Sequence, residues 1–531
     1  MCKKVSIWCA VLLAAAFIRS AAAGNLLEIT WTGNGDGTTW EDPQNWDLNI
    51  APNAASHVAV FDALPGEIIL DGRLGPEITI GDLRVSRYPD VFVLTGVASG
   101  TRFTLGEQPC KDDLPDMTFD NSTVNVDVAV NIDLGPGDDT FTIDLSSTEQ
   151  FGFSNVTFMQ PITTNDNDLI IMTEDTDTAL FRMDDDFADG NSGDVSIDGT
   201  VAVGVDSALS ADVLNVTDGD ITITDTAGQL NVNSVRLNRG SLNLPGDATP
   251  TNPLPNLGNN IESSGGRVAL FGEQMTVPAG LTLNLGNTTV DVRDARVVKA
   301  DFNGTLTRSA GGTATFRTNA SSTIEFDNVA GVDPNGVIPY ALINDFNFPR
   351  YDDTTGEVSE LLTYTPLSTA SPGDAAQAVG NTVLDSDADV SVLKINNGNI
   401  DGGGNTITTE AILVKGVSAN ISNATIMPHH QPGNVVNDLI THAPVGGDRL
   451  SLTADIADNV LPTEWTINSP QAGRVTVNTS LSKTGDTNIL GGTVILNGQD
   501  ADLGGDRIKL GAGASVVLID MRMPRCDGRS T

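Results

Sequence analysis

The stretch from Val390 to Gly498 constrains the possible fold more than any other part of the chain. Its segments alternate apolar and polar residues, the pattern of a strand with one buried face; they read VSVLKI, NTITTEAILVK, ANISNATI, DRLSLTADI, EWTINS, RVTVNTS and TVILNG. Gly, Asn and Asp separate the segments and favour turns. The pattern returns about every twenty residues, which is typical of a solenoid rung. Because one rung cannot bury its apolar face alone, we expect the rungs to stack.

The composition limits the classes of partner. The 531-residue chain has a formal net charge of -41, 39% hydrophobic residues and 5% aromatic residues. That hydrophobic content, regularly alternated, argues against a disordered chain. The acidity argues against nucleic acid, which needs clustered Lys and Arg, and against anionic membrane surfaces. It fits a solvated extracellular surface or divalent cation binding, and solubility is the simpler explanation.

Residues 1–23 have the features of a secretory signal peptide. Lys3 and Lys4 precede an apolar core from Ile7 to Ile18, and Ala21 to Ala23 form a small-residue cleavage site. The two cysteines that follow this segment allow one bridge at most, which is no disulfide framework. No later stretch is long and apolar enough to span a bilayer. We therefore expect a protein without a transmembrane segment that is secreted, either extracellular or at a cell surface.

Three of the five tryptophans, Trp31, Trp40 and Trp46, lie near the predicted mature N-terminus. A solenoid needs an atypical terminal unit to shield the open end of its core, and large aromatic side chains do this with few residues. The sequence therefore predicts an N-terminal cap. The functional alternative is carbohydrate binding by exposed Trp faces.

One segment resembles part of a calcium-binding repeat. Residues 135–141 read GPGDDTF, which matches the G-x-G-x-D-x-apolar half of the nonapeptide repeat. In such repeats, stacked turns supply carboxylate and backbone oxygens to the same Ca²⁺. Asp138 and Asp139 are thus candidate calcium ligands. Since a single copy supplies half a site, an acidic turn is the competing interpretation.

The most acidic region lies within residues 160–195. Its acids could form a cation site, but their spacing does not fit an EF-hand loop, so we expect a solvated loop. The residues concerned are Asp184, Asp185, Asp186, Asp189 and Asp194.

The spacing of predicted strands and turns suggests where the chain divides into segments. The break TPTNPLPNLGNN at 249–260 is a plausible domain boundary. After residue 330 the alternation is interrupted, which predicts an irregular insert with Phe346, Phe348 and Tyr351 packed over the side of the solenoid. The expected divisions are a cap with first rungs (24–105), an acidic solenoid segment (106–250), a further segment (261–330), a β-helix with the insert (331–500) and a C-terminal tail (501–531).

Two stretches resemble a known family. The opening WTGNGDGTTWEDPQNW, and the succession GVIPYA, YDDTTGEV, DADVSVLKINNGNIDGGGNTITTEAILV and SKTGDTNILGGTVILNG, look like bacterial surface proteins with autotransporter-associated β-strand repeats. The resemblance implies a right-handed parallel β-helix, similar to an autotransporter passenger, on the outside of a bacterial cell. The family usually has several repeat copies, and true autotransporters end in a transmembrane barrel. Only about thirty residues follow the repeat here, too few for the strands of such a barrel.

Several catalytic or binding patterns can be weighed and set aside. The tail VVLIDMRMPRCDG resembles the phosphoacceptor strand of a response-regulator receiver, with Asp520 as acceptor, but the downstream Lys is missing, so a last rung or a frame-shifted end is preferred. His429, His430 and His442 lack the helical spacing of common zinc motifs, which favours a polar loop. No nucleophile elbow and no phosphate-binding glycine loop stands out.

These observations favour an all-β chain: a right-handed parallel β-helix (β-solenoid) with an N-terminal cap. We expect a structural or adhesive role without catalysis, through shallow contacts along an acidic face with extracellular glycans or other surface proteins. No cofactor is expected, apart from the Ca²⁺ considered at Asp138 and Asp139. The alternative is a polysaccharide lyase or glycoside hydrolase on the same scaffold, which would need paired carboxylates.

Overall fold

The structure, a computed structural model, consists of strands, turns and two short 3-10 turns, η1 (Pro43–Asn45) and η2 (Leu367–Thr369). Within the residues it describes, no helix has the length and apolar character needed to cross a bilayer. Those residues are 26–62, 67–71, 73–74, 77–86, 92–96, 102–105, 117–120, 125–129, 131–133, 140–145, 153–159, 162–163, 168–173, 178–183, 193–205, 209–223, 230–245, 257–271, 274–293, 299–416, 418–430, 437–505, 507–511 and 513–519.

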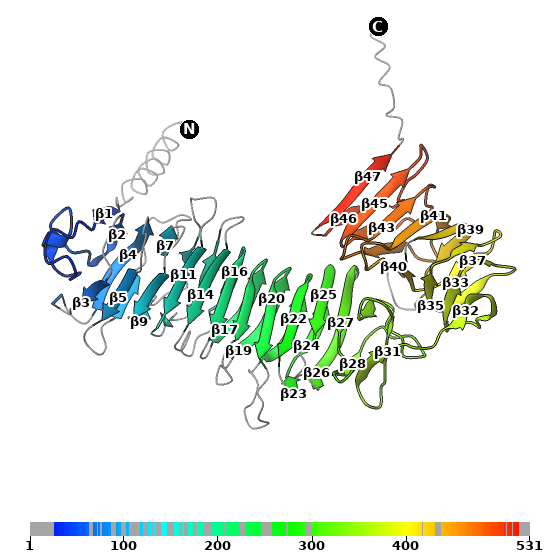
Figure 1. Cartoon of the computed structure of the whole chain (residues 1–531), viewed down its shortest axis with the longest axis horizontal. Helices are drawn as coiled ribbons and strands as arrows, with labels where there is room; N and C mark the ends of the chain where they lie inside the picture. Colours follow the sequence, from blue (N-terminus) through cyan, green and yellow to red (C-terminus); the bar gives the residue numbers. More distant parts are fainter. Residues whose placement is uncertain are drawn as a thin grey trace, which may run out of the picture. The chain divides into compact units, whose positions relative to one another are not determined.

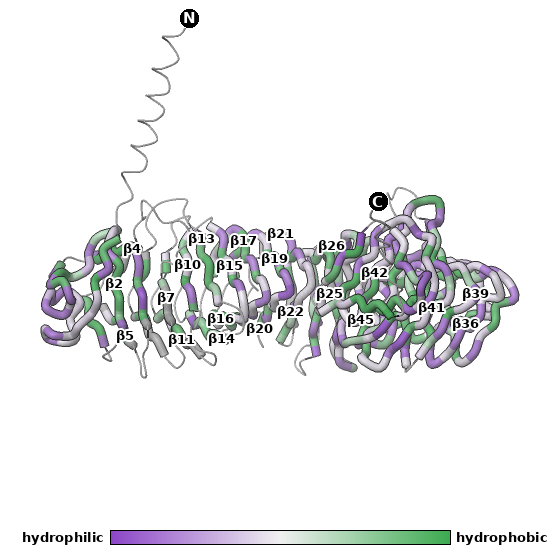
Figure 2. Tube along the Cα trace, turned by 90° about the horizontal axis from the view of Figure 1, so that it is seen from above, coloured by the Kyte–Doolittle hydropathy of each residue, from purple (hydrophilic) through white to green (hydrophobic). Residues whose placement is uncertain are grey.

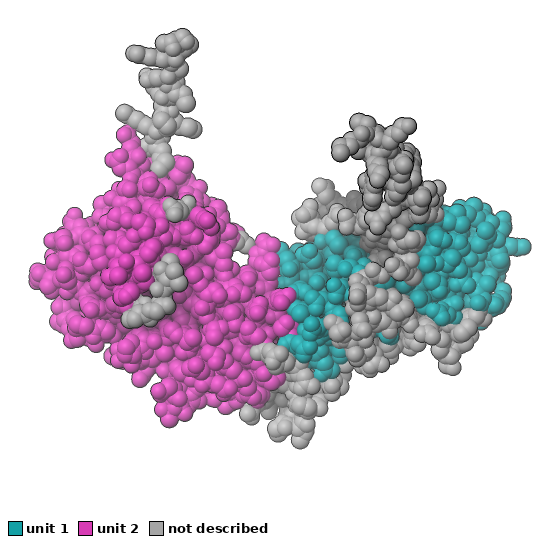
Figure 3. Space-filling view, turned by 180° about the vertical axis from the view of Figure 1, so that it is seen from behind, with its two compact units in different colours: residues 1–233 teal, residues 234–531 magenta. Residues whose placement is uncertain are grey.

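The chain divides into two compact units, residues 1–233 and 234–531 (Figure 3). In unit 1 the strands belong to two sheets, and neighbouring strands within each sheet pair in parallel. One sheet contains β1 (Leu27–Thr30), β2 (Ala54–Phe61), β4 (Glu77–Ser86), β6 (Arg102–Leu105), β7 (Met117–Asp120), β9 (Asn131–Asp133), β10 (Thr140–Asp144), β12 (Ile162–Thr163), β13 (Asp168–Met172), β15 (Val195–Asp198) and β17 (Leu209–Thr217). The other contains β3 (Glu67–Leu70), β5 (Phe92–Gly96), β8 (Asn125–Ala129), β11 (Phe153–Phe158), β14 (Thr178–Met183), β16 (Val201–Val205) and β18 (Asp220–Ile223).

Strand β19 (Leu230–Asn238) runs across the division between the units. In unit 2 we call residues 234–329 the first arm, residues 330–364 the linking segment and residues 365–519 the second arm. The first arm has one sheet of β20 (Ser241–Pro245), β22 (Gly266–Phe271), β25 (Gly286–Asp291), β27 (Gly312–Arg317) and, from the linking segment, β29 (Ala341–Ile343). Its other sheet contains β21 (Leu257–Ser263), β23 (Gln274–Val277), β24 (Gly280–Leu283), β26 (Lys299–Arg308) and β28 (Thr323–Val329).

The second arm is a further stack of parallel rungs with two faces (Figure 1). The first, which we call the seam sheet, contains β32 (Thr365–Pro366), β33 (Asp374–Val379), β35 (Ala388–Asn396), β38 (Ala411–Lys415), β40 (Asn437–His442), β42 (Thr463–Asn468), β44 (Thr487–Ile489) and β46 (Ile508–Leu510). The second, the open sheet, contains β34 (Thr382–Val383), β36 (Asn399–Asp401), β37 (Thr406–Thr408), β39 (Ala419–Met427), β41 (Arg449–Ile456), β43 (Arg474–Val477), β45 (Gly492–Asn497) and β47 (Ala514–Ile519).

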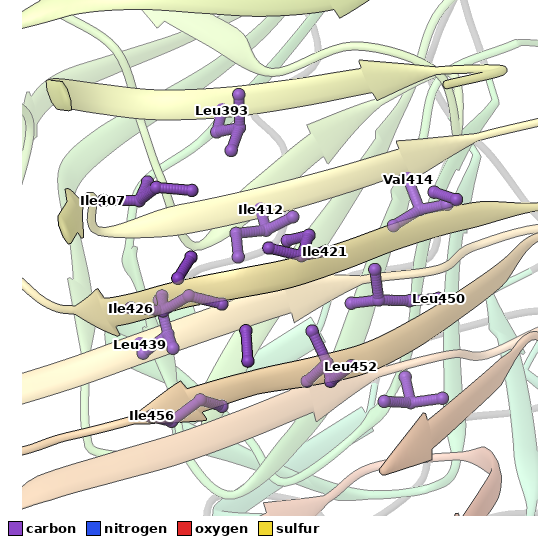
Figure 4. Close-up of a cluster of buried hydrophobic side chains, with 14 of the residues drawn as sticks. Leu393, Ile407, Ile412, Val414, Ile421, Ile426, Leu439, Leu450, Leu452 and Ile456 are labelled. Atoms are coloured by element: carbon purple, nitrogen blue, oxygen red, sulfur yellow. The ribbon is translucent and has the colours of Figure 1, made fainter. Parts of the chain in front are cut away.

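Period-two alternation builds the core of the second arm. Every second residue of a strand faces the interior and meets the equivalent residue of the next rung, as Leu393 meets Ile412 and Leu450 meets Val475. These side chains from both sheets form one buried cluster (Figure 4). Each fully buried Leu or Ile contributes about 1.5 to 3 kcal/mol. The alternation of hydrophilic and hydrophobic residues can be followed along the strands in Figure 2.

The parallel β-solenoid is therefore confirmed. Hydrogen bonds between side chains of neighbouring rungs join residues 18 to 28 positions apart, in agreement with the repeat of about twenty expected from the sequence. Close stacking also fixes some turns. Gly286 has φ +146°, and a Cβ there would lie 2.5 Å from the backbone nitrogen of Gly265, so this corner requires glycine.

The N-terminal cap is confirmed as well. Trp31, Trp40 and Trp46 are 3%, 0% and 1% exposed, and their rings surround Phe61 with centroids 5.4 to 5.8 Å from its ring. The Nε1 of Trp40 donates to the carbonyl oxygen of Pro52. Because these three rings are buried, the alternative of carbohydrate binding by exposed faces of Trp31, Trp40 and Trp46 is wrong.

The linking segment is irregular, as expected. Its strands β30 (Pro349–Tyr351) and β31 (Glu357–Glu360) form an antiparallel pair. Phe348 and Tyr351 are buried, but Phe346 is 45% exposed, so its predicted packing is wrong. It follows a tight turn in which Asn344 and Asp345 have φ of 53° and 63°, and this turn projects its ring outward beneath the Lys415 ammonium, 4.9 Å away.

Strand β47 (Ala514–Ile519) shows how the last described stretch of the chain folds. Strand β47 pairs in parallel with β45, from Ala514 opposite Gly492 to Ile519 opposite Asn497. The interpretation of this stretch as one last rung is confirmed for residues 514–519. Asp520, the acceptor position of the receiver-like pattern, lies outside the described residues.

Candidate functional site

The candidate calcium ligands Asp138 and Asp139 lie outside the described residues, as do Asp184, Asp185, Asp186 and Asp189. Asp194 is described, and its carboxylate accepts a hydrogen bond from the backbone of Val213. Across the described ranges, no group of three or more His, Cys, Asp or Glu is arranged to hold a metal ion. The calcium hypothesis thus stays a prediction from the sequence.

Unit 2 does bring acids together, on the outward face of the seam sheet. Asp438 of β40 pairs in register with Glu464 of β42. Asp486 precedes β44 as Glu464 precedes Trp465, and Trp465 pairs with Thr487, so Asp486 continues the same column. We call Asp438, Glu464 and Asp486 the acid ladder. Neighbouring strands lie about 4.8 Å apart, which sets the spacing of the three backbones.

Each acid of the ladder contacts a donor from the next rung. Thr466 Oγ1 donates to Asp438 Oδ1 over 3.2 Å, and Asn488 Nδ2 donates to Glu464 Oε2 over 3.4 Å. Lys509 Nζ lies 3.0 Å from Asp486 Oδ2.

Cations balance the two ends of the acid ladder. Asp438 also pairs with the Nη2 of Arg308, which comes from the first arm. Asp438 and Asp486 each contact a basic side chain, whereas the direct donor to Glu464 is the neutral amide of Asn488.

The central position of Glu464 affects its ionisation. Burial raises the pKa of Glu464, and the neighbouring negative charge of Asp438 raises it further. Nearby, burial lowers the pKa of Lys483 to about 8, and its Nζ donates to the carbonyl oxygens of Gly485 and Asp486. A carboxyl group of raised pKa beside a second carboxylate is an arrangement suited to proton transfer.

The acid ladder borders a polar seam where the seam sheet packs against the first arm. Asn468 Nδ2 donates to Asn287 Oδ1 over 3.0 Å, and Asn287 Oδ1 also accepts from Thr313 Oγ1. His442 is completely buried in this seam; its Nε2 lies 3.1 Å from the carbonyl oxygen of Pro339, and its Nδ1 lies 3.2 Å from Asn468 Nδ2. Burial lowers the pKa of His442 to about 4, so the imidazole is neutral at pH 7.

The histidines of the rejected zinc pattern have separate surroundings. His429 Nε2 lies 2.7 Å from Asp389 Oδ1, and its Nδ1 lies 3.7 Å from Glu410 Oε1. The neighbouring carboxylates of Glu410 and Asp389 raise the pKa of His429. His442 instead contacts the linking segment and Asn468, so these two histidines serve different contacts.

The open sheet carries ladders of polar side chains on its outward face. Asn497 Nδ2 donates to Asn478 Oδ1 over 2.8 Å, and Asn478 Nδ2 donates to Ser451 Oγ over 2.9 Å. Equivalent bonds join Asn399 to Asn381 and Ser515 to Thr493. These side chains are exposed or half-buried and recur at the spacing of the rungs. They form a periodic surface of amides and hydroxyls.

Sequence reasoning did not find the acid ladder. Its acids lie 22 to 26 residues apart, so no local pattern links them, and acids are frequent throughout the chain. The available signal was the repeated placement of an acid directly before an inward-facing residue of consecutive rungs. No protein-family model, curated protein or solved structure matches this chain.

Proposed function

We propose that this chain is a secreted or cell-surface structural β-solenoid that adheres to extracellular glycans or to other surface proteins, without catalysing a reaction. The observation that carries this proposal is the open sheet, whose amide and hydroxyl ladders repeat from rung to rung. Such groups offer many weak hydrogen bonds to a long polymer, and repeated weak contacts give avidity.

Other features support the same proposal. The net charge of -41 favours solubility, and the signal-like residues 1–23 would direct the protein to the outside of the cell. The resemblance to proteins with autotransporter-associated β-strand repeats points in the same direction. A solenoid with a buried aromatic cap presents its sides, rather than its N-terminal end, to a partner.

The test is binding by the purified full chain to immobilised glycans and extracellular matrix proteins. Wild-type protein should bind at least one polymer, and Asn478→Ala with Asn497→Ala should weaken that binding at least tenfold. As a matched control, Asn405→Ala changes an asparagine whose Nδ2 donates to backbone carbonyl oxygens within the arm, and binding should persist. We call the Asn478→Ala, Asn497→Ala pair the open-sheet variant. Equal binding by this variant and by wild type would contradict the proposal that the open sheet is the binding surface.

A second function is favoured by the acid ladder. Adjacent carboxylates with one raised pKa are the groups that a glycoside hydrolase uses as acid and nucleophile or base. Glu464 would donate the proton and Asp486, on the next rung, would act as the second carboxylate. Reducing-sugar release from a polysaccharide panel, abolished in Glu464→Gln and retained in the open-sheet variant, would establish this activity in place of adhesion alone.

A further inference from the structure

One buried and two half-buried side chains meet at the join between the linking segment and the second arm. Lys394 Nζ contacts Asn347 Oδ1, and Asn347 Nδ2 contacts Glu360 Oε1. Lys394 lies on β35 in the seam sheet, Asn347 lies in the turn after β29, and Glu360 ends β31. An amine, a carboxamide and a carboxyl group therefore form a continuous chain of contacts between two separate parts of unit 2.

The fold holds this group in place on both sides. Ile343 and Asn347 exchange backbone contacts across the tight turn, with Ile343 N donating to the carbonyl oxygen of Asn347. Glu360 pairs with Pro349 in the antiparallel β30–β31 pair, so its side chain lies beside Asn347. Lys394 is fixed by its parallel pairing with Leu413 and Gln377 on the neighbouring rungs.

The amine is buried beside an aromatic ring. Lys394 is only 6% exposed, and its Nζ lies 4.8 Å from the centroid of the Tyr364 ring. The Tyr364 hydroxyl accepts a hydrogen bond from the backbone of Phe348, which is completely buried. Burial lowers the pKa of Lys394 to about 8, and the nearby charge of Lys415 lowers it further, so a fraction of the amine is unprotonated and nucleophilic near neutral pH.

We propose that Lys394 and Asn347 become joined by an intramolecular isopeptide bond, with Glu360 transferring the proton. The Lys394 Nζ lone pair attacks the Asn347 carboxamide carbon, and a C–N bond forms. Glu360 accepts the proton lost by Nζ and delivers it to Nδ2, which leaves as ammonia when its bond to carbon breaks. Amine and primary amide give secondary amide and ammonia, Glu360 returns to its starting state, and no oxidant or reductant is needed.

The bond would tie the linking segment to the seam sheet. It closes a covalent loop between residues 47 positions apart, and such a closure restricts the unfolded chain. The linking segment joins the two arms of unit 2, so the bond would keep the seam assembled when the chain is pulled or locally unfolded. This inference is independent of the ligand proposed for the open sheet.

The test is peptide mass spectrometry of the wild-type full chain after tryptic digestion. Trypsin cleaves after Arg317, Arg350 and an unmodified Lys394, so an unlinked chain gives peptides 318–350 and 351–394. The isopeptide bond blocks cleavage at Lys394 and should give a branched species of 318–350 joined to 351–415. Its mass should be about 17 Da below the sum of the two peptides, because one ammonia is lost.

Two glutamate variants assign the role of Glu360. Glu360→Gln should abolish the branched species and leave both separate peptides, while Glu357→Gln, a matched change on the same strand, should retain it. Lys415→Arg keeps both the positive charge and the tryptic site at residue 415, so the branched species should be retained with the same peptide bounds. Recovery of separate 318–350 and 351–394 peptides from wild-type protein, with the Asn347 amide intact, would overturn the proposal whatever the variants show.

Discussion

The core of the second arm and the polar seam are equally buried but opposite in chemistry. The core has columns of Leu, Ile and Val, with Trp465 completely enclosed. The seam encloses Asn468, Asn488 and His442, which are also completely buried, and in the part of the chain that the structure describes Asn468 Oδ1 and Asn488 Oδ1 have no hydrogen-bond partner. The core is thus stabilised by apolar area, and the seam by specific polar contacts.

This difference shows how one strand serves two kinds of packing. In β42 the inward residues Trp465 and Ile467 complete the solenoid, while the outward residues Thr466 and Asn468 face the acid ladder and the first arm. Burial of apolar area is non-directional, so the core tolerates exchanges of similar volume. A buried polar group depends on one partner, so the seam should be sensitive to small geometric and ionisation changes.

Replacement of Trp465 by Ala should give the largest effect in the comparison. The change creates a cavity between rungs and leaves the Thr441 hydroxyl without the Nε1 donor 2.9 Å away. We expect a loss of about 3 to 5 kcal/mol in the free energy of unfolding, measured by denaturant titration with circular dichroism. Trp465→Phe should lose clearly less, and equal losses would show that apolar volume does not dominate this core.

Acidification should weaken the seam while leaving the core unchanged. Because burial lowers the folded-state pKa of His442 to about 4 from the ordinary 6.5, the unfolded chain binds more protons between these values, and stability falls as pH drops through this window. The contribution is about 3 kcal/mol at full effect. It should be absent from His442→Gln when unfolding is followed from pH 7 to pH 4.

The same pH series needs a histidine outside the seam as its control. His430→Gln changes an exposed histidine and should follow the wild-type pH dependence. If the curves of wild type and His442→Gln run parallel from pH 7 to pH 4, His442 is not buried as a neutral group, and the seam is more open than described.

Two glycines with positive φ, Gly311 at the seam and Gly373 away from side-chain contacts, distinguish the effect of close packing at the seam from the effect of backbone strain. Gly311 has φ +79°, and a Cβ there would lie 3.2 Å from Asn488 Nδ2 and 2.6 Å from the Leu285 side chain. Gly373 has φ +83° with nothing within 4 Å. Both Ala variants carry the cost of positive φ, so Gly311→Ala should be less stable than Gly373→Ala by about 1 to 2 kcal/mol. Equal melting temperatures would argue against close packing at this point of the seam.

The exposed polar ladder should show the smallest effect on stability. Asn497→Ala removes one hydrogen bond, to Asn478, on the solvated face of the open sheet. We expect the free energy of unfolding to change by no more than about 0.5 kcal/mol in thermal unfolding, although the double variant Asn478→Ala with Asn497→Ala should weaken ligand binding. A loss comparable to that of Gly311→Ala would indicate that the open sheet is structural rather than adhesive.

The sequence predicted the core far better than the seam, for a physical reason. Inward residues such as Leu450 and Val475 repeat within each strand, and local alternation reveals them. The buried tryptophans of the cap were likewise predicted, since large aromatics at a solenoid end have few other uses. The prediction that Phe346 is packed over the solenoid failed because two successive residues with positive φ, Asn344 and Asp345, turn its side chain outward. Composition does not specify that turn.

The seam residues could not be identified from local pattern. Asn287 and Asn468 are 181 positions apart, and each resembles an ordinary outward-facing residue of its own strand. Their contact depends on how the linking segment brings the second arm back against the first, which the alternation of apolar and polar residues does not specify. The same holds for Lys394, Asn347 and Glu360, whose meeting depends on the β30–β31 pair.

The packing of the second arm on the first is the central claim, and the Arg308–Asp438 pair tests it most directly. These residues lie 130 positions apart and come from different arms. A double-mutant cycle with Arg308→Ala and Asp438→Ala should give a coupling free energy of about 1 to 3 kcal/mol in unfolding experiments on the full chain. Strictly additive effects of the two substitutions would contradict the folded-back arrangement of unit 2.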